Sequence, residues 1–226
     1  MALVIGVTGA IAAGKSSLCT YLVERHGAIH ADADRVVHRM YDPGRPGFDR
    51  IVARFGEDVI GADGFIDRRV LGAKVFGDAE KMKALTEAIG DIRGEIKGII
   101  EHWRATLPSD QLCIVEVSQL LEGPYPLWCD QSWLVAIDPE IALERLMARN
   151  GFTEAEARQR LASSRPWEER APLVDRIVMN STTREDLARD IDEAIADTLD
   201  RFRAGSLGEA RFIAWTREQE AATGGA

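Results

Sequence analysis

Short apolar runs alternate with longer amphipathic stretches along most of the chain. The first run, residues 3–7, is almost wholly apolar and rich in β-branched residues, which is typical of a parallel strand buried on both faces. The stretch from about Lys15 to His26 then has a helical period, with Leu18, Leu22 and Val23 on one side. Further apolar runs recur at helix-length intervals, so the expected core strands are residues 3–8, 28–32, 112–117, 133–137 and 176–179. This alternation predicts an α/β fold, a parallel sheet flanked by helices.

The segments between these strands differ in character, which suggests how the chain is organised. Residues 34–107 are polar and mostly helical in pattern, with a break near Gly56–Gly64, and we expect an inserted helical region there. Residues 150–170 are rich in Arg and Glu and lie between two strands, where a mobile lid is expected. The pattern weakens after Phe202. We therefore expect one domain over residues 1–202 and a C-terminal tail over 203–226, frayed at its Gly-rich end.

The segment from Gly9 to Ser16 matches the P-loop pattern G-x-x-x-x-G-K-[ST]. A glycine turn that binds nothing could match the same four fixed positions, but a predicted strand before it and a predicted helix after it favour phosphate binding. Lys15 is expected to neutralise phosphate charge, and the Ser16 hydroxyl to ligate Mg²⁺. ATP and Mg²⁺ are thus the expected cofactors. The residues expected to contact the nucleotide are Gly9, Ala10, Ile11, Ala12, Ala13, Gly14, Lys15, Ser16 and Ser17.

Two carboxylates follow the second predicted strand, beside the expected P-loop. Asp34 could accept the proton of an attacking hydroxyl group. It could equally cap the helix that begins near Arg35, which is a common use of Asp. The pattern around Asp32 and Asp34 leaves both interpretations open.

Composition narrows the class of protein. The 226 residues are 46% hydrophobic and 29% charged, which is typical of a globular fold. A formal charge of −9 argues against a nucleic-acid partner but not against a phosphorylated small molecule. No apolar run approaches the roughly 20 residues of a membrane helix, and the apolar segment 1–13 lacks the basic leader of a signal peptide. We expect a cytoplasmic protein without a membrane partner.

The cysteines, His30 and an Arg- and Glu-rich run are interpreted as structural rather than functional. Cys19, Cys113 and Cys129 are odd in number and show no paired metal-ligand spacing, so we expect reduced core thiols and neither disulfides nor a zinc site. His30 has no partner visible in the sequence. The Arg- and Glu-rich run over residues 154–170 favours a solvated helical face with ion pairs.

Several motifs together resemble the dephospho-CoA kinase family, in order and spacing, over nearly all of Leu3–Asn180. The amino-terminal motifs are residues 7–16, Asp32-Ala33-Asp34 with His38, Phe55-Gly56, Asp67-Arg68-Arg69 with Leu71, and Val75-Phe76. The carboxyl-terminal motifs are Leu120-Leu121-Glu122, Arg145 to Asn150, Arg160, Asp175 and Asn180.

This resemblance implies phosphoryl transfer from ATP to the ribose 3′-hydroxyl of dephospho-CoA, by a P-loop core with a helical substrate-binding region and a lid. It implies that Asp34 is the general base, that Lys15 and the lid residue Arg149 act on the phosphates, and that Asn180 lies near the adenine. The implied partners are ATP and dephospho-CoA, and we expect a monomer or small homo-oligomer. The residues implied to bind the acceptor are Asp32, His38, Arg68, Arg69 and Glu122.

The chain departs from the family pattern mainly on the acceptor side. Gly90-Asp91 replaces a His-Pro pair, and Ser118-Gln119 replaces an apolar pair. Glu116 stands where an Asp is usual, and Ser164 where the lid has Gln. The alternatives are therefore a related nucleoside or small-metabolite kinase with an altered acceptor pocket, or a regulatory ATP-binding module without catalysis. In the loop, Ala10, Ala12 and Ala13 replace Gly, Gly and Ser.

Overall fold

The chain divides into two compact units, which we describe separately. The structure, a computed structural model, describes residues 1–163 and 165–223. The sheet unit comprises Met1–Ala31 and Ile100–Ala226, and the helical unit comprises Asp32–Ile99. Ser164 and the Gly-rich end, for which expectations were given above, lie outside the described residues.

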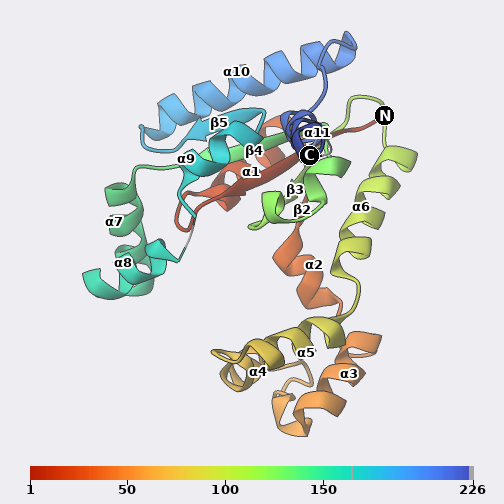
Figure 1. The fold of residues 1–226 in the computed structure, drawn as a ribbon, viewed down its shortest axis with the longest axis vertical. Helices are drawn as coiled ribbons and strands as arrows, with labels where there is room; N and C mark the ends of the chain where they lie inside the picture. Colours follow the sequence, from red (N-terminus) through yellow and green to blue (C-terminus); the bar gives the residue numbers. More distant parts are fainter. Residues whose placement is uncertain (164, 224–226) are drawn as a thin grey trace. The chain divides into compact units, whose positions relative to one another are not determined.

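The sheet unit is built on five strands in the order β2-β3-β1-β4-β5 (Figure 1). Strand β1 pairs in parallel with β3 and with β4, and β4 pairs in parallel with β5. Every residue of β1 is buried, as its apolar sequence predicts. The prediction of a parallel sheet flanked by helices is confirmed. The strands are β1 (Leu3–Gly9), β2 (Ile29–Asp32), β3 (Leu112–Glu116), β4 (Gln131–Ala136) and β5 (Arg176–Met179).

One face of the sheet is covered by α1 (Lys15–His26) and α10 (Arg184–Arg203), whose apolar side chains share a core cluster with alternate residues of β1. Leu18 and Leu22 of α1 are buried in this cluster, but Val23 is 38% exposed. Val23 was expected on the same side, yet it lies one residue and about 100° around the helix from Leu22. A Cβ on Gly6 would contact Leu120 and Cys129, so the opposite face of β1 meets the segment around η2 (Leu120–Glu122) and η3 (Tyr125–Trp128).

A helical hairpin follows β4. Its helices α7 (Pro139–Asn150) and α8 (Glu154–Ala162) pack through Leu143, Leu146 and Ala157. Thr153 begins α8 with a capping box, because its hydroxyl accepts the Glu156 N–H while the Glu156 carboxylate accepts the Thr153 N–H. The partly buried loop residues Ile11 and Ala12 pack against the same cluster. The hairpin therefore lies against the expected phosphate loop.

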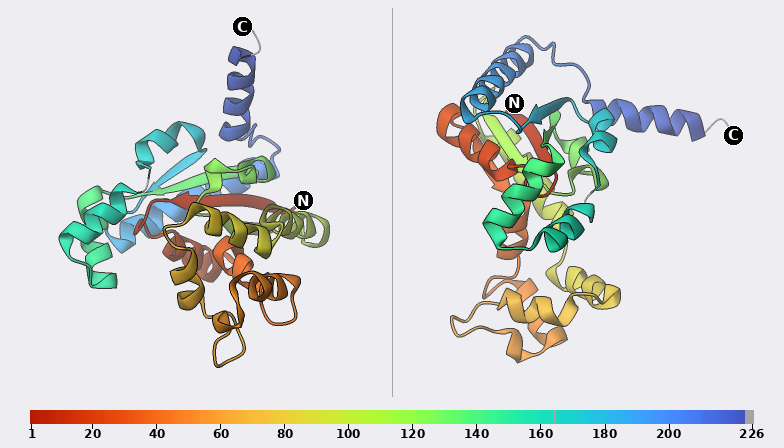
Figure 2. Two further views of the ribbon diagram at one scale, coloured as in Figure 1. Left: turned by 60° about the horizontal axis from the view of Figure 1, so that its bottom comes forward. Right: turned by 90° about the vertical axis from the view of Figure 1, so that its left-hand side faces the viewer.

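A final helix, α11 (Arg211–Thr223), follows α10 where the sequence indicated only a tail. The half-buried Asp175 carboxylate fixes its start by accepting the Arg211 N–H at 2.7 Å. The helix contacts η3, η4 (Ala171–Leu173) and β4 near its first turns. Its later turns extend away from the sheet (Figure 2). These anchors come from distant parts of the chain, so the local pattern did not reveal them.

The helical unit has its own core, centred on Ile51, Val59, Leu71 and Val75. Several of its helices are capped by an Asp side chain, and one of these, Asp67, accepts two backbone N–H groups. The helices are interrupted between Val59 and Arg68, close to the break that was expected near Gly56–Gly64. The elements are α2 (Ala33–Arg39), α3 (Pro46–Phe55), η1 (Glu57–Val59), α4 (Arg68–Val75), α5 (Ala79–Ile89) and the start of α6 (Ile92–Thr106).

Candidate functional site

The loop between β1 and α1 has two positions that only glycine fits. A Cβ on Gly9 would lie 2.6 Å from the Val135 carbonyl oxygen of the neighbouring strand. Gly14 has φ 90°, and a Cβ there would collide with the Asn180 side-chain nitrogen. That nitrogen instead donates a 2.8 Å hydrogen bond to the Ala13 carbonyl. The glycines and Asn180 thus fix the curvature of the loop.

Ala12 is the residue of this loop that adopts an unfavourable conformation. Its φ is 61°, in the left-handed region where a Cβ crowds the backbone. Strain of this kind costs an L-residue about 1–2 kcal/mol. The resemblance noted above places a glycine at this position in other sequences.

We expect Ala12→Gly to leave stability unchanged or raise it by up to about 1.5 kcal/mol. Relief of the strain, about 1–2 kcal/mol, is opposed by the greater backbone entropy of unfolded glycine, about 0.5–1 kcal/mol. Urea unfolding of the two proteins measures the difference. Ala10→Gly is the control, because Ala10 has no positive φ and should lose stability from the entropy term alone. A larger loss in Ala12→Gly than in Ala10→Gly would contradict the assignment of strain.

The first turn of α1 presents backbone N–H groups and the positive end of the helix dipole to the loop. The Lys15 ammonium lies over the loop and donates to the carbonyl oxygens of Gly9 at 3.0 Å and Ala10 at 3.4 Å. Gly14, at the N-cap, has no side chain that would block access to these amides. The arrangement suits a polyphosphate anion.

Ser16 is linked to an acidic residue at the end of the neighbouring strand β3. Its hydroxyl donates to Glu116 Oε1 at 2.9 Å, and Glu116 Oε2 lies 3.2 Å from His30 Nε2 on β2. Burial raises the pKa of Glu116, but the nearby His30 ring, the hydrogen bond from Ser16 and the charge of Lys15 outweigh burial, so this pKa lies below its ordinary value. Glu116 is therefore an ionised carboxylate beside the Ser16 hydroxyl.

Glu116 was not among the residues predicted for the site. It was noted only as a departure from a usual Asp. The signal was its position as the last residue of a buried apolar strand, because the carboxyl ends of parallel strands meet at one edge of the sheet.

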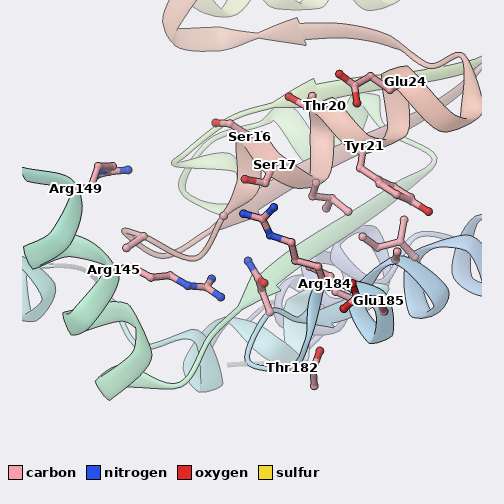
Figure 3. Close-up of a pocket in the computed structure, with 17 residues that line it drawn as sticks. Ser16, Ser17, Thr20, Tyr21, Glu24, Arg145, Arg149, Thr182, Arg184 and Glu185 are labelled. Atoms are coloured by element: carbon pink, nitrogen blue, oxygen red, sulfur yellow. The ribbon is translucent and has the colours of Figure 1, made fainter.

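A pocket of about 930 Å³ opens beside the phosphate loop. Ser16 and Ser17 lie on one side of it, and Figure 3 shows Arg145 and Arg149 on α7 and Arg184 on α10 around it. These cations suit an anionic ligand. Arg145 and Arg184 were not predicted as site residues. The lining residues are Ala12, Gly14, Ser16, Ser17, Leu18, Thr20, Tyr21, Glu24, Arg145, Arg149, Asn180, Thr182, Arg184, Glu185, Leu187, Ala188 and Ile191.

The Arg-rich run divides into exposed and buried members. Arg158 pairs with Glu140 and Glu154, and Arg165 pairs with Glu169, as expected of a solvated face. Arg170 does not follow this prediction, because it is only 3% exposed. Its guanidinium donates to the Thr8 hydroxyl at 2.7 Å, just before the phosphate loop.

Arg170 also connects that loop to a predicted acceptor residue. Its guanidinium donates to the Ser118 carbonyl at 3.3 Å and lies 3.6 Å from Glu122 Oε2. Burial lowers the pKa of Arg170, and the charge of Glu122 opposes this shift. One buried cation thus holds together β1, the segment after β3, and Glu122.

The remaining predicted residues lie in the helical unit. Asp32 is the cap of α2, since its carboxylate accepts the N–H groups of Asp34 at 2.9 Å and Arg35 at 3.4 Å. Asp34 is exposed in the first turn and leaves the cap position to Asp32. The Arg68 guanidinium lies 2.9 Å from His38 Nδ1. Burial and the charge of Arg68 lower the pKa of His38.

Arg69 is exposed one residue further along α4. The unit therefore presents Asp34, His38, Arg68 and Arg69 on the first turns or ends of two helices, α2 and α4. The structure brings His38 and Arg68 into contact.

Known proteins are similar to this chain in sequence and in fold. The sequence model described as "Dephospho-CoA kinase" matches residues 3–186. A dephospho-CoA kinase of Shouchella clausii is 36% identical over 195 residues, covering 86% of this chain and 98% of that protein. One of Streptomyces avermitilis is 37% identical over 208 residues, covering 92% and 98%. The crystal structure of TT1252 from Thermus thermophilus matches with a TM-score of 0.68 and 27% identity, covering 86% of this chain and 97% of that one.

No helix in the described ranges has the length and apolarity that a membrane crossing requires.

Proposed function

Because the chain belongs to the dephospho-CoA kinase family, an ATP-dependent kinase family, we propose that it phosphorylates the ribose 3′-hydroxyl of dephospho-CoA. The products are coenzyme A and ADP. The observation that carries the proposal is the glycine-shaped loop beside a pocket of about 930 Å³, with the Lys15 ammonium on the loop carbonyls and the Ser16 hydroxyl bonded to Glu116. The backbone N–H groups of the loop, the Lys15 ammonium and the Ser16 hydroxyl are the groups that bind the phosphates and Mg²⁺ of a nucleoside triphosphate in P-loop enzymes.

The donor side follows from the sheet unit. Backbone N–H groups of the loop and the first turn of α1 hold the phosphates, and Lys15 exchanges its carbonyl partners for phosphate oxygens. Arg145 and Arg149, both on α7, neutralise charge on the phosphoryl group that is transferred. Asn180 supports the loop and lies near the adenine. Negative charge on the phosphoryl oxygens is stabilised by these fixed cations.

Mg²⁺ fits the oxygen donors of this site, since the Ser16 hydroxyl and the ionised Glu116 carboxylate are the hard ligands this ion prefers. We assign Ser16 to direct contact and Glu116 to a supporting contact through water. When bound, the ion offsets phosphate charge.

On the acceptor side, we assign residues 34–107 to acceptor binding and residues 150–170 to a lid. Asp34 takes the proton of the 3′-hydroxyl as the oxygen attacks the γ-phosphorus. The bond to the β,γ-bridging oxygen breaks, and ADP leaves. We assign His38, Arg68 and Arg69 to binding of the anionic acceptor, Asp32 to positioning of α2, and Glu122 to a further acceptor contact.

The family assignment does not favour an altered kinase or a regulatory module. Gly90-Asp91, one of the departures, also has a structural account. Gly90 ends α5 with φ 112°, which L-residues rarely adopt. Asp91 then caps the start of α6 by accepting the Gly94 N–H at 2.8 Å. This pair therefore shapes a helix junction.

Incubation with ATP, Mg²⁺ and dephospho-CoA, followed by mass spectrometry, tests the proposal. We expect coenzyme A and ADP in equal amounts. A parallel panel of nucleosides and sugar alcohols should give no acceptor-dependent ADP. Turnover of a nucleoside without turnover of dephospho-CoA would overturn the acceptor assignment, and ATP binding without any turnover would favour the regulatory module.

Glu116→Gln should raise the Mg²⁺ concentration needed for half-maximal activity by about tenfold. The amide keeps the shape of the side chain but removes the charge, and loss of a supporting partner costs about 10–100-fold in metal affinity or activity. Initial rates measured against Mg²⁺ at saturating ATP give this value. The exposed Glu24, at the far part of the pocket, provides the control variant Glu24→Gln. An equal shift in both variants would contradict the role of Glu116.

A cytoplasmic location and a monomeric or small homo-oligomeric state stay predictions.

A further inference from the structure

Three side chains with different metal-binding atoms meet beside the first turn of α1. They are Cys19 on α1, His30 on β2 and Glu116 on β3, and one ligand atom from each lies within 4.8 Å of the others. The sequence spacing gave no indication of this cluster, because the three residues are brought together by the sheet order and by one turn of helix after Ser16.

The cluster is mostly buried, with His30 partly exposed, and it is electrostatically incomplete. Cys19 is 0% and Glu116 6% exposed. His30 Nε2 and Glu116 Oε2 are both inaccessible and lack a partner with hydrogen-bond geometry among the described residues, although they are 3.2 Å apart. Two lone-pair atoms that face each other at this distance repel unless a positive charge lies between them. A proton on His30 or a metal ion supplies that charge.

We propose that Cys19, His30 and Glu116 form a zinc-binding site. Tetrahedral zinc, with bonds of about 2.0–2.3 Å, separates its ligand atoms by roughly 3.2–3.7 Å. The nitrogen–oxygen distance of 3.2 Å already meets this spacing, and small side-chain rotations bring in the sulfur. A thiolate with an imidazole selects zinc over Mg²⁺. A water molecule completes four ligands.

Charge balance also favours a divalent ion here. Binding releases the thiol proton, and the proton of His30 where it is present, to solvent. Thiolate and carboxylate then neutralise the two charges of zinc, so the buried site carries no net charge. The neighbouring Lys15 ammonium, whose charge helps to lower the pKa of Glu116, donates to the Gly9 carbonyl of the loop.

The site is connected to the nucleotide pocket through Glu116, whose other oxygen accepts the Ser16 hydroxyl. Zinc draws this carboxylate toward His30 and Cys19 and weakens its support of Ser16. Zinc should therefore inhibit the kinase. This consequence rests on the proposed function, whereas zinc binding itself does not.

Cobalt titration of the full chain, after removal of metals with a chelator, tests the site without turnover. We expect one Co²⁺ per chain, a thiolate-to-cobalt charge-transfer band, tetrahedral d–d bands, and loss of all of them when zinc is added. Cys19→Ala and His30→Ala should each lose at least about 10–100-fold in affinity, the loss caused even by removing an outer partner. Cys113→Ala is the matched control, because Cys113 is equally buried on β3 but outside the cluster.

Two results would overturn the proposal. One is a wild-type chain without a charge-transfer band at excess Co²⁺, and the other is a band that persists in Cys19→Ala. Circular dichroism of each metal-free variant checks folding, and the conservative Cys19→Ser and His30→Gln replace any variant that fails. A chain that binds zinc but shows no kinase activity when it is free of zinc and supplied with Mg²⁺ would refute the proposed function while leaving this site intact.

Discussion

Asp34→Asn should lower kcat by about 10²–10⁴-fold, the contribution of a general base, while ATP binding is retained. The amide cannot take the proton of the acceptor hydroxyl. Asn has nearly the same size and shape as Asp. Because Asp34 is exposed and does not cap α2, the substitution should not affect folding. Steady-state kinetics with dephospho-CoA and calorimetry with ATP separate the two quantities.

Asp49→Asn provides the control for this prediction. Asp49 is an exposed carboxylate in the first turn of α3, so the same change of charge occurs in the same unit. Asp32→Ala should instead destabilise α2 by about 1 kcal/mol, because it removes the cap. Unchanged kcat in Asp34→Asn would show that another group accepts the proton.

Lys15→Met should reduce kcat/KM for ATP by about 10²–10³-fold. An electrostatic contact aimed at the charge of the transition state is worth this much in other enzymes, and Met fills the same space without charge. Initial rates at varied ATP measure the change.

Lys15→Arg tests whether charge alone suffices. The guanidinium keeps the charge but cannot reproduce the compact ammonium against the loop, so we expect activity between those of Lys15→Met and wild type. A value of kcat/KM in Lys15→Met within tenfold of wild type would contradict the role of the ammonium.

The elements that local pattern alone determines were predicted closely. The sequence indicated β1 because a strand buried on both faces is apolar throughout. It indicated α1 because a helical period follows the glycines of the loop. Both α1 and β5 have the bounds that the sequence indicated. The parallel arrangement followed from the alternation of strands and helices, and the structure confirms it.

Features that depend on contacts between distant segments were not predictable. Arg170 lies in a polar run, yet Thr8, 162 positions earlier, accepts its hydrogen bond and holds it in the interior. Helix α11 depends on Asp175 in the same way. Whether Asp32 or Asp34 caps α2 depends on where the strand ends, which the pattern locates only to within a residue or two.

Glu116 shows the same limit at the candidate site. Its place at the end of β3 was visible in the sequence, but its contacts with Ser16 and His30 exist only because β3 lies between β1 and β2. Strand order is not encoded in any local period. The roles proposed for these residues await the experiments above.

The order of the strands also has a consequence for folding during translation. β1 emerges first, but both of its sheet neighbours, β3 and β4, begin more than a hundred residues later. At roughly 5–20 residues per second, translation leaves this apolar strand without a partner for about 5–20 seconds. The contiguous helical unit, Asp32–Ile99, is synthesised entirely within that interval. Nascent chains that stop before β3 should therefore be clients of chaperones that protect exposed apolar segments.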